Sequence, residues 1–193
     1  MRLTCSAGEK AMSIELVALD LLGGAHKQPE HLARHPFGVI PVLDDDGFVL
    51  YESRAIVRYL DARGAGASLV PAAPHDRARM DQWLSVDQSY VAPHLRALVG
   101  QRIVRKHQGL DADVTATDEA ERALAQAFAA IDRALDAERY LAGASFSLAD
   151  ISLMPYVAGL TSVEAAHTIA DLRHVQRWWR EVSTRPAWLR ATA

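Results

Sequence analysis

The pattern of apolar residues changes abruptly near residues 64–75, and this change constrains the fold more than any other feature of the sequence. Before it, short apolar runs alternate with turn residues; after it, almost the whole chain has helical periodicity. The sequence between, GAGASLVPAAP, is rich in Gly, Ala and Pro and is typical of a linker. We therefore predict an α/β domain at residues 1–64 and an all-helical domain at residues 74–193.

Three short apolar runs suggest strands in the first domain. The run Ile14–Leu19 contains one charged residue and predicts a buried strand. The runs Val39–Leu43 and Phe48–Tyr51 flank an Asp-Asp-Asp-Gly turn, and Asp-Gly between apolar runs predicts a β-hairpin. Ser53 then begins a helix, and Gly64 lies where its C-terminal cap is expected.

The second domain has helical signals throughout. We expect a long helix through Met80–Tyr90 that is interrupted near Pro93, because proline removes a backbone donor. A further helix has an apolar face at spacings of four, three and four residues. The residues of that face are Leu124, Phe128, Ile131 and Leu135.

Two local motifs mark the ends of the last helices. Ser147 and Asp150 have the spacing of a capping box, which predicts a helix start at this point. Pro155 lies inside that helix and predicts a kink. Trp178 and its neighbours predict a last amphipathic helix, which Arg185-Pro186 ends.

Composition excludes several classes of protein. The net charge of the 193 residues is −3, so a basic nucleic-acid-binding surface is not indicated. Cys5 is the only cysteine, which rules out an internal disulfide or a thiolate metal cluster, and the histidines show no metal-ligand spacing. No apolar run approaches the roughly 20 residues of a membrane span, and a signal peptide is not evident. We expect a cytoplasmic location without membrane association.

One long stretch and two later ones resemble a known family. The stretch AHKQPEHLARHPFGVIPVLDDDGFVLYESRAIVRYLDAR is similar to the glutathione-site half of glutathione transferases, most like the phi class and its bacterial relatives. FSLADISLMPY and WWREVSTRPAW resemble C-terminal helices of the same family. The resemblance implies a thioredoxin-like domain followed by a helical bundle, glutathione as co-substrate, a small-molecule electrophile as second substrate, and a homodimer.

The resemblance assigns the cysteine portion of glutathione to the loop before the hairpin. Ile40-Pro41 corresponds to a cis peptide bond in the family, which turns the Ile40 backbone outward to pair with glutathione. The phi pattern has glutamine before this residue, whereas this chain has Val39. Loss of that amide hydrogen bond is expected to weaken binding by about 1 kcal/mol, roughly fivefold.

The resemblance also assigns the two charged ends of glutathione. Glu52 would bind the γ-glutamyl ammonium, while the Ser53 hydroxyl and N–H bind its carboxylate. The start of a helix suits an anion because its first N–H groups lack partners, although Ser53 could also simply cap the helix. His26 and Lys27 resemble the basic pair that meets the glycyl carboxylate.

The first thirteen residues are short for this family, and two interpretations remain open. In one, RLTCSAGEK (residues 2–10) is the end of the first helix, and the first strand and the catalytic loop are absent, so the domain is incomplete. In the other, Met1–Ser6 is the first strand and Cys5 or Ser6 is the catalytic residue. The second leaves about six residues for a parallel crossover that needs a dozen or more, which favours the first. The Ile14–Leu19 strand would then lack a central neighbour.

Three functions follow from this resemblance. The chain would be a transferase that conjugates glutathione to hydrophobic electrophiles, a non-catalytic glutathione- or hydrophobe-binding relative, or a structural dimer partner. An acceptor pocket between the domains would be lined by Tyr90, His94 and Met154. The expected dimer surface comprises Arg54, Arg58 and Met80–Asp87.

Overall fold

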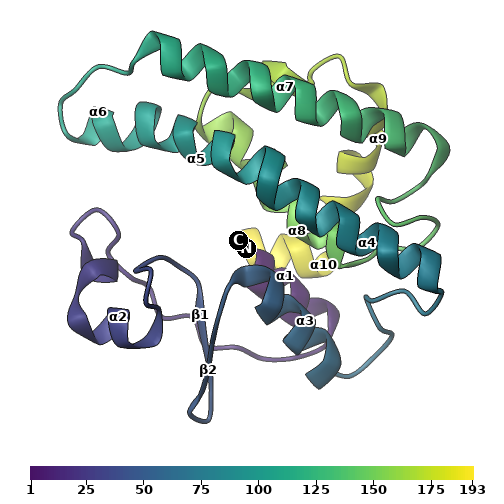
Figure 1. The fold of residues 1–193 in the computed structure, drawn as a ribbon. Coiled ribbons are helices and arrows are strands. Elements are labelled where there is room, and N and C mark those ends of the chain that lie inside the picture. Colours follow the sequence, from purple (N-terminus) through teal and green to yellow (C-terminus); the bar gives the residue numbers. More distant parts are fainter.

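The computed structural model describes all residues 1–193 and shows a single β-hairpin within an otherwise largely helical molecule (Figure 1). The elements of the first part are α1 (Arg2–Glu9), η1 (Ala25–Lys27), α2 (Pro29–Arg34), β1 (Val42–Asp45), β2 (Phe48–Tyr51) and α3 (Ser53–Arg63). Those of the second part are α4 (Pro74–Val86), η2 (Asp87–Val91), α5 (Ala92–Val99), η3 (Gly100–Val104), α6 (Arg105–His107), α7 (Val114–Ala137), α8 (Leu148–Ser162), η4 (Ala166–Ile169), α9 (Arg173–Val182) and α10 (Pro186–Thr192).

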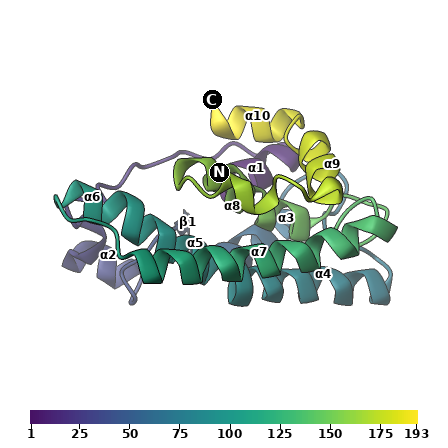
Figure 2. The same ribbon diagram turned by 90° about the horizontal axis from the view of Figure 1, so that it is seen from above.

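The second part is organised around two long helical runs. The run from α4 to α6 lies beside α7, and α8 lies between them and the first part (Figures 1 and 2). Helices α1 and α3 pack on each other and on α8, while α1 also packs on α10, so the two ends of the chain lie side by side. The hairpin and α2 stand at the edge of the molecule in Figure 1.

The main core belongs almost entirely to the helical part. The predicted apolar face of α7 is buried, with Leu124, Phe128, Ile131 and Leu135 at 1% exposure or less. The predicted capping box at Ser147 and Asp150 is present and begins α8. No helix of the structure has the length and apolar character needed to cross a membrane.

The predicted interruption near Pro93 takes the form of a widened helical turn. Between α4 and α5 the backbone makes a π-helical turn, η2, and Pro93 occupies the first turn of α5. A π-helical turn relieves the clash of a proline ring with the preceding carbonyl, so the axis continues through the proline. This turn places Asp87 at its start, where the residue is 2% exposed.

The predicted hairpin is confirmed, although its first strand is Val42–Asp45, three residues later than the run Val39–Leu43. Strands β1 and β2 pair antiparallel with Val42 opposite Tyr51. The two connecting residues, Asp46 and Gly47, have φ of 52° and 90°. Positive φ at both positions is the geometry that Asp-Gly favours. The core beneath the hairpin is small, since only Ala7, Ile56 and Leu60 are fully buried there.

The strand predicted at Ile14–Leu19 is absent, and this expectation was wrong. Residues 13–19 form no regular structure and no backbone hydrogen bonds, and the sheet contains only β1 and β2. Leu16 and Val17 are 72% and 84% exposed. An apolar run becomes a strand only where another strand supplies hydrogen-bond partners, and none lies beside this segment.

Both ends of the chain are helical, and two further predictions can be compared with them. Residues 2–9 form helix α1, as the first interpretation of the N-terminus predicts, and the alternative strand at Met1–Ser6 is wrong. Arg185-Pro186 ends the tryptophan helix as expected, but that helix is not the last one. Pro186 begins α10, because proline suits the first helical position.

A buried ion pair attaches the linker to the first part. The Lys10 ammonium lies 3.2 Å from the Asp61 carboxylate and donates to the carbonyl of Ala67. Asp61 in turn accepts hydrogen bonds from the N–H of Leu69 and the hydroxyl of Ser68. The Gly- and Ala-rich linker is therefore held against α1 and α3 at its start.

Candidate functional site

The loop before β1 contains the cis peptide bond that the resemblance implies. The Ile40-Pro41 bond is cis, and strand β1 begins at the next residue. Ile40 is 51% exposed, and neither its N–H nor its C=O has a hydrogen-bond partner in the chain. One unpaired donor and one unpaired acceptor therefore stand at the entry to a strand, where an extended peptide could pair with them.

The segment η1–α2 holds this loop through side chains that bond to its carbonyls. The Lys27 ammonium donates to the carbonyl of Phe37 at 3.2 Å. His31 Nε2 lies 2.8 Å from the carbonyl oxygen of Val39. Lys27 is exposed and retains donors for another partner, whereas Val39 is 45% exposed and offers no side-chain hydrogen bond.

His26 lies beneath the same loop. It is half-buried, and its Nδ1 is buried without a hydrogen-bond partner in the chain. Gly38 passes so close that an added Cβ would lie 2.8 Å from the His26 carbonyl oxygen, and its φ is +56°. Glycine is therefore required here for both space and conformation.

Glu52 and Ser53 form the junction between β2 and α3. Glu52 has φ 69° and ψ 106°, an unusual conformation for a non-glycine residue, and its exposed carboxylate has no hydrogen bond or ion pair. Ser53 is the first residue of α3 and is 8% exposed. Its hydroxyl does not cap the helix; instead, the Ser53 Oγ accepts a hydrogen bond from Arg2 Nη1 at 2.6 Å.

Behind Ser53, a buried polar network joins the two parts of the molecule. Arg54 forms an ion pair with Asp87 and donates to the Tyr156 hydroxyl at 3.0 Å. The Ser152 hydroxyl also donates to Asp87, and Arg2 donates to the Ser152 carbonyl. Two arginines thus face the one buried carboxylate of Asp87, and one of them, Arg2, also contacts Ser53.

The network also changes the acidity of Tyr156. Burial raises the pKa of its phenol, but the positive charges of Arg2 and Arg54 outweigh this effect, so the pKa lies below its ordinary value of 10.0. Arg2 also lies over the Tyr156 ring, 5.0 Å from its centroid.

Comparisons with known proteins identify the family. Residues 1–62 match the family model of the glutathione S-transferase N-terminal domain, and residues 86–186 match that of the C-terminal domain. This chain belongs to the glutathione S-transferase family. It is 38% identical to glutathione S-transferase F10 of Arabidopsis thaliana over 96% of this chain and 87% of the relative. It is 37% identical to glutathione S-transferase 3 of Zea mays over 100% of this chain and 88% of the relative.

Solved structures agree with this assignment to the glutathione S-transferases. Glutathione transferase F7 from Populus trichocarpa superposes with a TM-score of 0.91 at 34% identity, covering 99% of this chain and 91% of that one. Maize glutathione S-transferase I in complex with an atrazine glutathione conjugate superposes with a TM-score of 0.86 at 28% identity, covering 98% and 89%. The thioredoxin-like and helical parts predicted from the sequence are therefore those of a glutathione S-transferase.

The two candidate catalytic residues of this glutathione S-transferase lie inside the protein. Cys5 and Ser6 are on α1 and are both 0% exposed. Burial, with a smaller contribution from Glu9, raises the pKa of the Cys5 thiol to about 12. A thiol of this kind is neither accessible nor ionised at neutral pH, so neither side chain is placed to contact glutathione sulfur.

The three residues predicted to line the acceptor pocket have different environments. Tyr90 is 61% exposed and His94 is half-buried, on the surface of η2 and α5. Met154 is fully buried in the main core. The structure does not bring Met154 to an open surface together with the other two.

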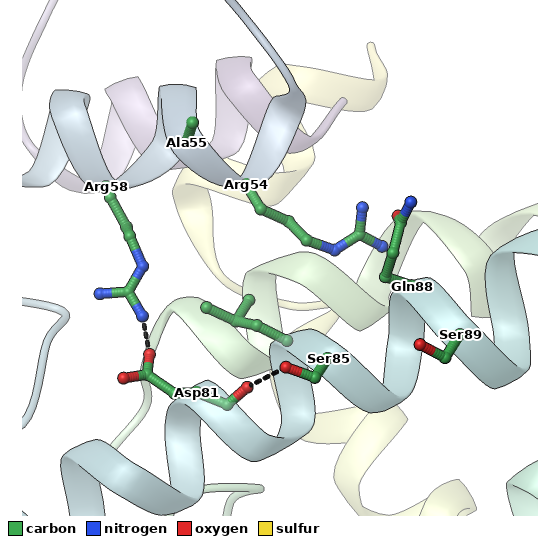
Figure 3. Close-up of a pocket in the computed structure, with 8 residues that line it drawn as sticks. Arg54, Ala55, Arg58, Asp81, Ser85, Gln88 and Ser89 are labelled. Carbon is green, nitrogen blue, oxygen red and sulfur yellow. Dashed lines mark hydrogen bonds and ion pairs between the residues drawn. The ribbon is translucent and has the colours of Figure 1, made fainter.

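A hollow of about 530 Å³ lies between α3 and α4, on the surface expected to form a dimer (Figure 3). Arg58 pairs with Asp81 across it, and Arg54 extends from α3 toward η2 (Figure 3). Met80, also predicted for this surface, is fully buried. Both arginines are therefore paired within the chain.

The sequence did not indicate Arg2, Asp87, Ser152 or Tyr156 as parts of the site. One signal was available, because Asp87 lies three residues after Leu84 and four before Val91, on the apolar face of one helix. A carboxylate on a buried face predicts a buried cationic partner. The identity of that partner depends on packing between helices far apart in the sequence.

Proposed function

We propose that this glutathione S-transferase binds glutathione along the Val39–Pro41 loop and the Ser53 end of α3, and conjugates it to small hydrophobic electrophiles. The observation that carries the proposal is the exposed Ile40 backbone at the entry to β1, with its free donor and acceptor. The family assignment supports it, and so does a solved relative, maize glutathione S-transferase I, described in complex with a glutathione conjugate.

Each part of glutathione has a chemically suitable partner in this arrangement. The Ile40 N–H and C=O would pair with the cysteinyl residue, as neighbouring strands do. The Ser53 hydroxyl and N–H would receive the γ-glutamyl carboxylate at the start of α3, and the unpaired Glu52 carboxylate would receive the ammonium. The free donors of Lys27, with His26 beside it, would meet the glycyl carboxylate.

The reaction is the formation of one carbon–sulfur bond. The glutathione thiol loses its proton to solvent, and the thiolate attacks the electrophilic carbon and displaces a leaving group such as chloride. The protein binds glutathione in one orientation and so restricts the conformations that the peptide can adopt before attack. In this proposal Cys5 and Ser6, both buried on α1, take no direct part in the reaction.

Assembly, location and domain limits extend the proposal. A homodimer would use the hollow between α3 and α4, where the paired side chains Arg58 and Asp81 are only partly exposed. The single unpaired cysteine suits a reducing compartment, which supports a cytoplasmic location. The division into residues 1–64 and 74–193 also remains our proposal.

Calorimetric titration with reduced glutathione, combined with a chloronitrobenzene conjugation assay, tests the function. Ser53→Ala should weaken glutathione binding by about 10- to 100-fold, because a hydrogen bond to a charged group contributes about 1.5–3 kcal/mol. Ser162→Ala, at an exposed position on α8, is the matched control and should bind normally. Absence of binding by the unaltered chain would refute the whole proposal, whereas binding without acceleration would refute only the transferase part.

A further inference from the structure

We propose that Arg2 is a positioning residue that prepares the Ser53 hydroxyl to donate to the γ-glutamyl carboxylate and makes this end of the site selective for a carboxylate. The inference rests on the proposed binding of glutathione at Ser53. It begins from the 2.6 Å hydrogen bond between Arg2 Nη1 and Ser53 Oγ.

The direction of this hydrogen bond determines what Ser53 can do next. A guanidinium has donors and no acceptor, so the Ser53 oxygen must be the acceptor in its bond with Arg2. The hydroxyl hydrogen is then directed elsewhere, and the structure contains no other hydrogen-bond partner for this hydroxyl. Ser53 is thereby left with one free donor, as a carboxylate ligand requires, and the cationic partner strengthens that donor.

The guanidinium is held so that it cannot turn away from Ser53. Its Nε and Nη2 both donate to the Ser152 carbonyl, at 3.2 and 2.6 Å. The Arg2 side chain is only 11% exposed and lies over the Tyr156 ring. Two hydrogen bonds from Arg2 to the Ser152 carbonyl on α8 leave Nη1 as the group that faces Ser53.

No carboxylate of the chain accepts a hydrogen bond from Arg2. The nearest carboxylate, Asp87, lies 4.0 Å from Arg2 Nη2, and it is already paired with Arg54 and bonded to Ser152. A carboxylate that reaches Ser53 therefore meets a guanidinium that has no direct carboxylate hydrogen bond and is partly desolvated, so the charge interaction is screened less than in water. A ligand without that carboxylate gains nothing from Arg2.

A purely structural role for Arg2 would have different consequences. If Arg2 only tied α1 to α8, its replacement would weaken every ligand of the site equally. Selectivity for the carboxylate is therefore the property that separates the two roles.

The experiment measures the dissociation constants of two ligands by calorimetry. One is glutathione, and the other is the analogue in which 4-aminobutyrate replaces the γ-glutamyl residue, so that only the α-carboxylate is missing. The unaltered chain should bind glutathione at least about tenfold more tightly than the analogue. If the unaltered chain binds neither ligand, or binds the two equally tightly, the proposed binding of glutathione at Ser53 is refuted, whatever the role of Arg2.

The variant Arg2→Gln then tests the inference itself. It should weaken the binding of glutathione at least about tenfold and that of the analogue less than twofold. The control Arg185→Gln breaks the ion pair between Arg185, which lies just before α10, and Glu9 on α1, and should leave the ratio of the two dissociation constants unchanged. Arg2→Lys keeps the positive charge, so the logarithm of the ratio of the two dissociation constants should stay at half or more of its value in the unaltered chain. This second variant keeps the inference testable if Arg2→Gln does not fold. Equal weakening of both ligands by the folded variants, or no weakening, would overturn the inference.

Discussion

Replacing Asp150 by alanine should destabilise the helical part of this glutathione S-transferase more than any substitution on its surface. The Asp150 carboxylate is fully buried and accepts four hydrogen bonds. Its Oδ1 accepts from the Leu141 N–H at 3.0 Å and from the Trp178 indole N–H at 2.8 Å. Its Oδ2 accepts from the Ser147 N–H at 2.9 Å and from the Ser147 hydroxyl at 3.0 Å.

The magnitude follows from the donors left behind. Asp150→Ala leaves three buried N–H groups without acceptors, each of which costs about 1–3 kcal/mol, whereas the Ser147 hydroxyl can rotate. Removal of a buried charge offsets part of this cost, so we expect a net loss of about 3–5 kcal/mol in the free energy of unfolding. Asp150→Asn retains an oxygen for Leu141 and Trp178 and loses only the Ser147 side, so about 1–2 kcal/mol should be lost.

Urea unfolding at neutral pH, followed by far-ultraviolet circular dichroism, measures these losses. Asp171→Ala is the matched control, because Asp171 is exposed and forms no side-chain hydrogen bond or ion pair, and it should change stability by less than about 0.5 kcal/mol. A loss below about 1 kcal/mol for Asp150→Ala, or equal losses for the alanine and asparagine variants, would refute the argument from unsatisfied donors.

Three further predictions concern the first part of the chain. Cys5 should not react with an aromatic disulfide in the folded protein, because its pKa of about 12, against an ordinary 9.0, lowers the thiolate fraction by about 1000-fold; rapid labelling without denaturant would contradict this. Gly64→Ala should cost about 1–3 kcal/mol in urea unfolding, because the added Cβ would lie 2.5 Å from a lysine side-chain carbon, whereas Gly100→Ala, in open space within a helical run, should be neutral or stabilising. Burial lowers the pKa of His35 below its ordinary value of 6.5. The unfolded chain therefore binds a proton at this residue more readily than the folded chain does. The stability that this difference contributes is present above pH 6.5 and is lost as the pH falls through the pKa of the folded state. His35→Phe should therefore reduce the slope of unfolding free energy against pH below 6.5, while His75→Gln, at an exposed position, should leave it unchanged.

Features set by neighbours in the sequence were predictable from the sequence. The Ser147–Asp150 capping box and the Asp46–Gly47 turn depend on side chains and backbone angles within four residues, so local chemistry is sufficient to specify them. The resemblance to the family correctly placed the cis bond at Ile40-Pro41. Gly64 was correctly placed at the C-terminal cap of α3, but its φ is −82°, so space beside α1, not a left-handed conformation, explains the glycine.

Features that need a distant partner were decided only by the tertiary structure. Ile14–Leu19 has the composition of a buried strand, yet it stays unpaired, with Leu16 and Val17 exposed, because no neighbouring strand lies beside it. Arg2 and Ser53 are 51 positions apart, and their hydrogen bond exists only because α1, α3 and α8 pack together. The family resemblance, the apolar face of α7, the start of α8 and the Asp46–Gly47 turn could be read from the sequence alone, since each depends on short-range patterns. The charge that surrounds Ser53 depends on the packing of three helices, so only the folded chain decides it.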